Sequence, residues 1–354
     1  MRQDEKKLNP LLKVMMNKGF KLLKFLKFSQ RCLVILGLVS LCHAQILPKT
    51  TKSNGVQWPT KPVTLVVGYP AGSGIDTVAR FLAQELREKT NQAWIVENKP
   101  GAVANLAARY VASAPPDGYT VLFTPNSTHG INPHIYKNLG FDPIKDFQPV
   151  TSLLSLGFVL LVNPKTVPVS TVEELTQFIK ARPGQLAYAS GNASGHVAAE
   201  WYKQIVGFDA VHVPYKGVPQ AISDMIGGNI HFMFADATLG IPTAKSGKLK
   251  PLAVTNSIRV QSIPDVPTML ESGVKGYDFT SWFGVFFPAK APMDITEKFA
   301  EYCNAVMTTP KAKEFLLGLG AEPNPSNPEA FAKVVEREIN KWGPIVKAAK
   351  IEPE

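Results

Sequence analysis

The sequence predicts an α/β fold built as two lobes joined by a hinge, and three observations carry this prediction. Short apolar runs alternate with amphipathic helical patterns, which is typical of mostly parallel sheets covered by helices on both faces. This alternation occurs twice, first over residues 61–123 and again from residue 158 onward. Each series contains a strand, a loop rich in glycine and serine, and a helix, in that order. A chain of 354 residues is long enough for two such lobes with cores of their own.

The composition and the position of the charges narrow the class of protein. With 45% apolar and 19% charged residues, the composition is that of an ordinary globular protein. The formal net charge is +10, but residues 1–31 hold nine Lys and Arg against two acidic residues and so account for +7 of it. The rest of the chain is close to neutral and has no excess of basic residues that would attract a polyanion such as a nucleic acid. No nucleic-acid partner is therefore expected.

The N-terminal segment has the pattern of an export signal. A basic stretch, an apolar run of roughly ten residues and a small residue, Ala44, predict a secretory signal peptide over residues 1–44. The apolar run is shorter than the about 20 residues that a membrane-spanning helix needs. A lipoprotein acylated at Cys42 is the alternative, and the bulky Leu41 before it argues against that reading. Residues 45–58 are predicted to be a disordered lead-in. After cleavage one cysteine, Cys303, would remain, and we expect it to be a small buried hydrophobe rather than half of a disulfide.

The first series predicts the first lobe. The apolar run 63–67 reads as a buried strand, and further strands are expected at 93–97 and 119–123. Ile75, Val78 and Leu82 recur at helical spacing after the first strand, and a second helix is expected around 106–111. Residues 125–150 read as loop-rich.

The second series predicts the second lobe and the return to the first. Strands are expected at 158–162, 186–189, 210–213, 230–234 and 249–254, with helices at 171–181, from residue 196, and at 219–226. An aromatic strand at 279–287 then leads back, with Trp282 and Phe283 expected in the core or at the hinge, and the remaining residues read as helical. The predicted domains are therefore 59–155 together with 281–354 for lobe 1, and 156–280 for lobe 2.

The two glycine- and serine-rich loops are the predicted binding site. The first N–H groups of a helix lack intrahelical partners, and together with the helix dipole they favour an anion. In open α/β sheets ligands bind at the carboxyl ends of the strands, where both loops fall, and glycine lets the backbone approach a ligand closely. Neither loop contains Lys or Arg. We therefore predict that both loops hold one small carboxylate through uncharged backbone groups.

The predicted ligand-binding residues come from these loops and from polar side chains after other strands. The first loop supplies Tyr69, Pro70, Ala71, Gly72, Ser73, Gly74 and Asp76. The second supplies Ser190, Asn192, Ala193, Ser194, Gly195 and His196. A third group is predicted to select the other end of the ligand, namely Asn126, Ser127, His129, Tyr215 and Asp236.

For three of these residues the pattern is compatible with a structural role as well as with ligand binding. Asp76 is interpreted first as a helix cap, and the alternatives are that it faces a ligand's amine or orients the N–H groups of the loop. His196 could equally donate to a ligand or cap its own loop. Asp236 could face the cleft or be an ordinary turn residue.

Other kinds of site find no support in the pattern. Gly72-Ser73-Gly74 resembles the start of a dinucleotide fingerprint, but Thr77 occupies the third glycine position, and no phosphate-binding Gly-Lys-Ser/Thr occurs here. The histidines are scattered without metal-ligand spacing. The nucleophile elbow Gly-x-Ser-x-Gly does not occur around the loop serines. We therefore predict a protein that is not an enzyme, with no catalytic residue, metal or cofactor. The alternative is an exported α/β hydrolase or esterase with a loop serine, which requires a Ser–His–acid set in one cleft.

An ordered set of short stretches is similar to the extracytoplasmic solute receptors of tripartite tricarboxylate transporters, the Bug family. The resemblance runs through nearly all of residues 59–345 and includes Pro70-Ala71-Gly72-Ser73-Gly74, Val96-Glu97-Asn98-Lys99-Pro100-Gly101, Ala114-Pro115-Pro116-Asp117-Gly118-Tyr119, Ser190-Gly191-Asn192-Ala193-Ser194-Gly195-His196 and Pro264-Asp265-Val266-Pro267-Thr268. It implies a fold like that of type II periplasmic binding proteins. It also implies that a small carboxylate, such as a di- or tricarboxylate, an amino acid or an aromatic acid, binds between the two lobes.

The resemblance further implies location and partners. The protein would be a monomer in the periplasm of a Gram-negative bacterium, and membrane permease subunits of such a transporter, or a sensor kinase, would be its partners. Two departures from the family pattern bear on the ligand. Val103-Ala104 stands where a Gly-Gly pair is usual, and the first loop has Ala71 and Ile75 in place of Gly and Thr. The identity of the ligand is therefore not carried over from the family.

Overall fold

The computed structural model describes residues 55–353. The predicted signal peptide and residues 45–54 of the predicted lead-in lie outside the described residues. Trp58, at the predicted end of the lead-in, is only 4% exposed, and its ring centroid lies 5.7 Å from that of Trp94 and 5.5 Å from that of Phe299. The ordered core therefore begins before residue 59. Within the described part of the chain, no helix combines the length and apolarity needed to cross a membrane.

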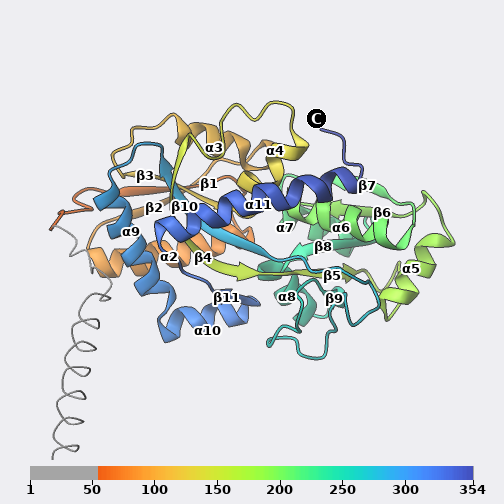
Figure 1. The fold of residues 1–354 in the computed structure, drawn as a ribbon. Coiled ribbons are helices and arrows are strands. Elements are labelled where there is room, and N and C mark those ends of the chain that lie inside the picture. The colour runs from red at the N-terminus through yellow and green to blue at the C-terminus, as the bar shows by residue number, and fades with distance from the viewer. Residues whose placement is uncertain (1–54, 354) are drawn as a thin grey trace, which may run out of the picture. The chain divides into compact units, whose positions relative to one another are not determined.

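The first of two sheets has six strands in the order β11-β4-β10-β3-β1-β2 (Figure 1). Their bounds are Val63–Val67 (β1), Trp94–Asn98 (β2), Thr120–Pro125 (β3), Phe147–Leu156 (β4), Ser281–Pro288 (β10) and Ala321–Pro323 (β11). β1 pairs in parallel with β2 and β3, whereas β10 runs antiparallel to β3 and β4, and β11 antiparallel to β4. We call the part of the chain that carries this sheet lobe 1.

The second sheet has five strands in the order β7-β6-β8-β5-β9. Their bounds are Phe158–Val162 (β5), Ala187–Ser190 (β6), Val211–Pro214 (β7), Phe232–Asp236 (β8) and Lys250–Val254 (β9). β6 is parallel to β7 and β8, while β5 is antiparallel to β8 and β9. We call this part lobe 2. The mixed α/β fold in two lobes confirms the predicted fold class, but the sheets are mixed rather than mostly parallel, because β4, β5 and β10 carry the chain between the sheets and insert antiparallel strands.

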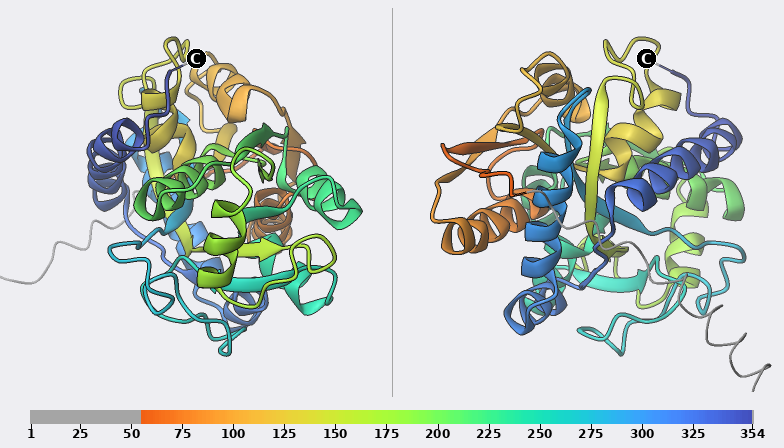
Figure 2. Two further views of the ribbon diagram at one scale, coloured as in Figure 1. Left: turned by 90° about the vertical axis from the view of Figure 1, so that its right-hand side faces the viewer. Right: turned by 60° about the vertical axis from the view of Figure 1, so that its left-hand side comes forward.

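Helices and helical turns pack against these sheets. In lobe 1 they are Gly74–Thr90 (α2), Ala102–Ala104 (η2), Asn105–Ala112 (α3), Ser127–Ile131 (η3), Asn132–Ile135 (α4), Met293–Met307 (α9), Pro310–Gly318 (α10) and Pro328–Ala348 (α11). In lobe 2 they are Val172–Lys180 (α5), Ala193–Val206 (α6), Val218–Gly227 (α7) and Ala237–Lys245 (α8). Both views of Figure 2 show the dark blue α11 beside the yellow segment with η3 and α4, which it contacts.

Two fully buried strands, β10 and β5, lie close to the points where the chain passes between the sheets. All eight residues of β10 are buried, and this strand lies between β3 and β4 in the middle of the first sheet. β5 is likewise buried along its whole length. The chain passes from β4 to β5 through one residue, Gly157, so the two sheets are joined directly. Cys303 is a buried free cysteine, as expected.

Several features of the fold were not predicted, including η3 and α4, which lie in the stretch 125–150 that was predicted to be loop-rich. β4 lies partly in the stretch read as loops, because Pro149 and a mixture of Ser, Thr and Leu hide its strand pattern; pairing with β10 and β11 on either side holds it. The short β11 and the helix α8, which contains Gly240 and Pro242, were also missed. α6 begins at Ala193 and not at His196, because the Asn192 side chain caps it.

Residues 102–104 of η2 adopt an unusual backbone. Ala102, Val103 and Ala104 have φ values of 45°, 50° and 71°, in the left-handed region that favours glycine. These residues include the two that replace the usual Gly-Gly pair of the family. Every described non-glycine residue with positive φ lies in lobe 1, the other positions being Asn91, Lys290 and Lys350.

Candidate functional site

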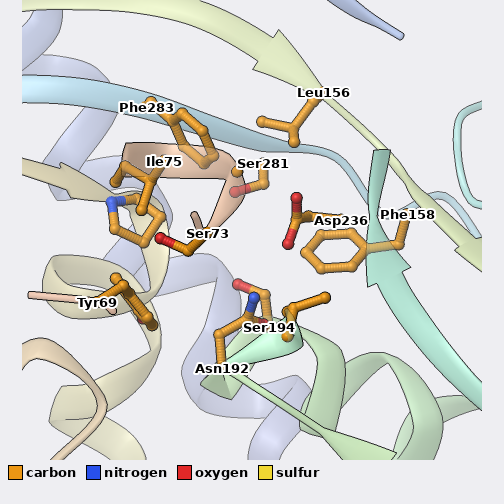
Figure 3. Close-up of a pocket in the computed structure, with 13 residues that line it drawn as sticks. Tyr69, Ser73, Ile75, Leu156, Phe158, Asn192, Ser194, Asp236, Ser281 and Phe283 are labelled. Carbon is orange, nitrogen blue, oxygen red and sulfur yellow. The ribbon is translucent and has the colours of Figure 1, made fainter. Parts of the chain in front are cut away.

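A small cavity lies between the two lobes, and both predicted loops reach it (Figure 3). Six of the predicted residues line it: Tyr69, Ser73, Gly74, Asn192, Ser194 and Asp236. The space leaves about 20 Å³ for the centres of water molecules, which is room for one water or slightly more. The lobes are therefore in contact around a small space, and a larger guest requires them to move apart.

The first loop presents the N-terminus of α2 to this cavity. Ser73 is extended and caps the helix, its hydroxyl accepting from the Asp76 backbone N–H at 3.4 Å. Gly74, the first residue of α2, approaches lobe 2 so closely that a Cβ there would lie 2.7 Å from Asp236 Oδ1 and would overlap the Thr238 hydroxyl. Only glycine allows this approach of the two lobes. Ala71 and Gly72 are exposed outside the cavity, and Pro70 packs near Gly217 of lobe 2.

Asp76 faces the interior of lobe 1 and not the cavity. Its carboxylate accepts hydrogen bonds from the Gly72 backbone N–H at 2.9 Å, from Arg80 Nε at 3.0 Å and from Asn98 Nδ2 at 2.9 Å. Burial alone would raise the pKa of Asp76, but these donors and the Arg80 charge outweigh burial and hold it below its usual range. Asp76 thus orients the N–H of Gly72 in the first loop, whereas the cap of α2 is Ser73 and not Asp76.

The second loop presents the N-terminus of α6. Asn192 is its cap, and its Oδ1 accepts from the Gly195 N–H at 2.7 Å. Ser194 lies in the first turn, and its hydroxyl donates across the lobes to Asn126 Oδ1 at 3.2 Å. Ala193 and Gly195 are buried beside it, and a Cβ on Gly195 would lie 2.8 Å from the Phe234 carbonyl oxygen, so glycine lets α6 pack against β8.

Asn126 links elements that are distant in sequence. Its Oδ1 accepts from Ser281 Oγ at 2.6 Å as well as from Ser194, and its Nδ2 donates to Glu338 Oε2 at 3.4 Å. Glu338 also accepts from Trp342 Nε1 at 2.8 Å. Asn126 is fully buried and does not line the cavity. It is placed to hold the lobes in register.

Asp236 ends β8 and lies on the cavity wall opposite the start of α2. It is 6% exposed and accepts a short hydrogen bond from the Thr238 hydroxyl. Burial raises the pKa of Asp236 above its usual value, although hydrogen bonds from the Thr238 hydroxyl and the Leu239 backbone N–H oppose this. Among the described residues no Lys or Arg forms an ion pair with Asp236, and no basic residue is among those that line the cavity.

The apolar wall was not predicted. It consists of residues that end or begin strands and helices, namely Ile75, Pro125, Leu156, Phe158, Val218 and Phe283. Phe283 is buried in the core, one of the two places expected for it, and it also lines the cavity. Ser281 adds one polar group that sequence reasoning missed. A weak signal existed, because several of these residues stand where the chain crosses between the predicted lobes.

Three residues of the predicted third group, Ser127, His129 and Tyr215, are not among those that line the cavity. His129 is fully buried in lobe 1, with its ring stacked on Phe286 at a centroid distance of 4.0 Å and both ring nitrogens without a hydrogen-bond partner. Burial lowers the pKa of His129 to about 3. Ser127 approaches the Tyr69 hydroxyl at 3.5 Å, behind the cavity wall, and burial raises the pKa of Tyr69. The Tyr215 hydroxyl donates to Asp224 at 2.7 Å within lobe 2.

Ser190 and His196 belong to a histidine cluster formed by α6, β6 and β7. Ser190 Oγ is 2.7 Å from His212 Nε2, and the rings of His212 and His196 stack at 3.8 Å. Burial lowers the pKa of both histidines to about 4, so both are neutral at pH 7. A Ser–His pair therefore exists, but Ser190 is not among the residues lining the cavity, and no carboxylate within residues 55–353 hydrogen-bonds to His212. The hydrolase alternative requires a Ser–His–acid set in one cleft, and this pair does not supply one.

The described residues include no group of three or more His, Cys, Asp or Glu side chains that could hold a metal ion. What the cavity offers chemically is two capped helix N-termini from different lobes, one buried carboxylate and an apolar wall. Partial positive charge at helix N-termini suits a small anion.

Comparison with known proteins identifies the family to which the chain belongs. Residues 78–351 match the model of the tripartite tricarboxylate transporter family receptor. A Bordetella pertussis protein of the family UPF0065 is 31% identical over 312 residues, which is 87% of this chain and 96% of the relative. The B. pertussis protein BugT is 28% identical, over 82% of this chain and 90% of its own length.

Solved structures agree with the sequence comparisons. A protein of R. palustris solved with adipate has a TM-score of 0.82 and 34% identity, covering 84% of this chain and 100% of its own. The periplasmic binding protein BugD has a TM-score of 0.80 and 31% identity, covering 84% and 100%. MatC of Rhodopseudomonas palustris, solved with malate, has a TM-score of 0.78 and 29% identity, covering 82% and 100%. The chain therefore belongs to the receptors of the tripartite tricarboxylate transporter family, the Bug family, and has the fold of a periplasmic binding protein.

Proposed function

We propose that this protein binds a small organic carboxylate in the cavity between its lobes, gripped by the N-termini of α2 and α6. The single observation that carries the proposal is that the N-termini of α2 in lobe 1 and α6 in lobe 2 meet at one cavity. No Lys or Arg is among the residues that line this cavity. The relatives solved with adipate and with malate support a carboxylate as the ligand class.

The binding energy in this proposal comes from backbone N–H groups rather than from a basic side chain. A hydrogen bond to a charged group contributes about 1.5–3 kcal/mol. Several such bonds exceed the cost of association enough for micromolar binding. Because each lobe supplies part of the site, a bound acid holds the lobes together, which is the general logic of hinge closure around a ligand. Ser73, Gly74, Asn192 and Ser194 are the residues that we propose contact the carboxylate.

A screen of mono-, di- and tricarboxylates, amino acids and aromatic acids by thermal unfolding tests this function. A true ligand at 100 times its dissociation constant adds about 2.7 kcal/mol to the free energy of unfolding, so its midpoint shift rises with concentration. Calorimetry then measures the affinity of each acid that shifts the midpoint. A protein that no organic acid stabilises, at millimolar concentration and neutral pH, contradicts the proposal.

We further propose that the protein is exported, that its first 44 residues are removed, and that the closed form docks on a membrane permease or a sensor kinase. The basic and apolar pattern of residues 1–44 supports export, and the family supports the periplasm. Intact mass of the protein from a periplasmic extract tests the cleavage. A cytoplasmic protein of full mass contradicts it. Uptake of the labelled ligand by cells with and without the gene tests the transport role.

A further inference from the structure

We propose that the acid bound by this protein is an α-amino acid with an apolar side chain, and that Asp236 receives its ammonium group. This inference rests on the proposed function and narrows its ligand. Three observations support it. The carboxylate of Asp236 is buried in the cavity wall, it lies close to the N-terminus of α2, and most of the remaining wall is apolar.

Asp236 has no cationic partner in the described structure. It is 6% exposed, stands at the N-terminus of α8 and lines the cavity, and its donors are neutral, namely the Thr238 hydroxyl and the Leu239 backbone N–H. Figure 3 shows its carboxylate directed among the other side chains of the cavity and not back into lobe 2. A buried carboxylate without a cation is costly, and the protein contains the means to avoid it elsewhere, as Arg80 does for Asp76. A cation supplied by the ligand compensates this charge.

The same carboxylate argues against a second acidic group on the ligand. A dicarboxylate held at its first end by α2 and α6 would bring its other end into a small cavity that already contains Asp236 and that no Lys or Arg lines. Like charges a few ångströms apart in a poorly hydrated site repel strongly. Protonation of one of them is the way in which such a pair could coexist, and the experiment below distinguishes that case.

The short distance between α2 and Asp236 selects an α-amino acid among the possible zwitterions. A Cβ on Gly74, the first residue of α2, would lie 2.7 Å from Asp236 Oδ1. The anion-binding helix end and the cation-binding carboxylate are thus immediate neighbours across the lobes. A ligand that touches both carries its two charges on adjacent groups, and an α-amino acid has its ammonium and its carboxylate on one carbon.

The rest of the wall fits an apolar side chain of modest size. Leu156, Phe158, Val218 and Phe283 face the cavity, and its present volume is small. Burial of apolar ligand surface on these residues contributes about 25 cal/mol per Å². A long polar or charged side chain finds no matching charge among the lining residues.

Matched ligand pairs test the proposal. Calorimetry on protein purified from cells that express the full chain would compare L-valine with 3-methylbutanoate, L-leucine with 4-methylpentanoate and L-phenylalanine with 3-phenylpropanoate. Each pair differs only in the amino group. Succinate and adipate serve as dicarboxylate probes. At least one amino acid is expected to bind about tenfold or more tightly than its deaminated partner, since each 1.4 kcal/mol is a factor of ten.

Variants test whether Asp236 causes the preference for an amino acid over its deaminated partner. Asp236→Asn is expected to weaken amino-acid binding by about tenfold while changing the binding of the deaminated acids by less than about threefold. Asp209→Asn, which removes an exposed charge of lobe 2 away from the cavity, is the matched control and should behave as the unmodified protein.

The outcomes separate this inference from the proposed function. If a deaminated acid or a dicarboxylate binds as tightly as every amino acid tested, the ammonium proposal is overturned and carboxylate binding stands. An Asp236→Asn protein that folds and keeps the full preference for an amino acid also overturns it. If that variant does not fold, the ligand pairs on the unmodified protein decide. Binding by none of the acids overturns both.

Discussion

The two loops that reach the cavity are built alike in sequence and stabilised in different ways. In lobe 1 the loop before α2 is held from inside its own lobe, because Asp76 accepts from Gly72, Arg80 and Asn98. In lobe 2 the loop before α6 has no acidic residue in the first helical turn, and Ser194 instead donates to Asn126 of lobe 1. The first loop is therefore formed independently of lobe closure, whereas part of the second depends on it.

The same contrast extends to the buried histidines and to the backbone. His129 of lobe 1 lies among aromatic rings without a hydrogen-bond partner, while His212 of lobe 2 is bonded to Ser190 and stacked on His196. All described non-glycine residues with positive φ are in lobe 1. Lobe 1 thus carries the described non-glycine residues with a strained backbone, and lobe 2 carries the cavity's buried charge, Asp236. Changes in each lobe should separate effects on stability from effects on binding.

The largest expected effect on ligand affinity comes from filling the space between the lobes. Gly74→Ala places a Cβ 2.7 Å from Asp236 Oδ1 and against Thr238, so the lobes can no longer close as they do here. We expect ligand affinity to fall about 100-fold or more, by calorimetry, which corresponds to about 2.7 kcal/mol. Gly318→Ala in α10 is the control, because a Cβ there meets nothing within 4 Å. Equal affinity in both variants would mean that this contact does not limit closure.

His129 should set much of the acid sensitivity of lobe 1. Its pKa is lowered to about 3 by burial, against about 6.5 in an unfolded chain. The unfolded state therefore binds the extra proton first, and stability is lost as pH falls below about 6.5. His129→Phe should remove roughly 3 kcal/mol of the difference between pH 7 and pH 4, by urea unfolding. His212→Phe is the comparison in lobe 2. An unchanged pH profile for His129→Phe would show that this histidine is protonated without unfolding.

Asp76 should matter for stability more than for ligand contact. Asp76→Asn loses the charge that Arg80 faces and leaves donors competing for one oxygen, which should cost roughly 1–2 kcal/mol at pH 7 by thermal or urea unfolding. Because the pKa of Asp76 is lowered in the folded protein, this contribution is present above the unfolded value and disappears as pH falls through the folded pKa. The exposed Asp117, paired with Lys61, gives the control Asp117→Asn, with little expected loss. A variant as stable as the unmodified protein at pH 7 would refute the internal role of Asp76.

Ser194 tests whether the second loop depends on closure. Ser194→Ala removes the hydrogen bond to Asn126 at 3.2 Å, and should weaken ligand binding by about three- to tenfold and stability by about 1 kcal/mol or less. Ser223→Ala, in α7 of the same lobe, removes an exposed hydroxyl and is the control. If Ser194→Ala loses more stability than affinity, the bond across the lobes is structural and not part of closure.

The smallest effect concerns the strained backbone of η2. Ala102 is exposed with φ 45°, a conformation that costs an L-residue roughly 1–2 kcal/mol. Glycine relieves this cost but loses about 0.5–1 kcal/mol of conformational entropy. Ala102→Gly should therefore raise the free energy of unfolding by up to about 1 kcal/mol. Ala181→Gly in lobe 2, where φ is −72°, should lower it. Loss of stability in both variants would show that η2 is not strained.

Sequence reasoning located most strands and both loops because these features are local. The strands at 63–67 and 158–162 have the predicted bounds, since unbroken runs of β-branched and apolar residues leave little choice of structure. β4 was missed because its conformation depends on neighbours that follow more than a hundred residues later, in β10 and β11. The start of α6 was placed three residues late because the capping role of Asn192 is a matter of side-chain direction, which the pattern leaves open.

By itself the sequence determined the α/β class, the two repeated strand–loop–helix units and the family to which the chain belongs. Tertiary structure alone decided which side chains share the cavity. Asp76 and Asp236 are both acidic residues beside predicted helix or strand ends, yet one faces Arg80 in its own lobe and the other faces the opposite lobe. In the sequence, the apolar wall residues Leu156, Phe158 and Phe283 look like core residues. The local pattern predicts that a side chain is buried but not which part of the molecule it packs against. That choice is made only when strands from distant parts of the chain come together.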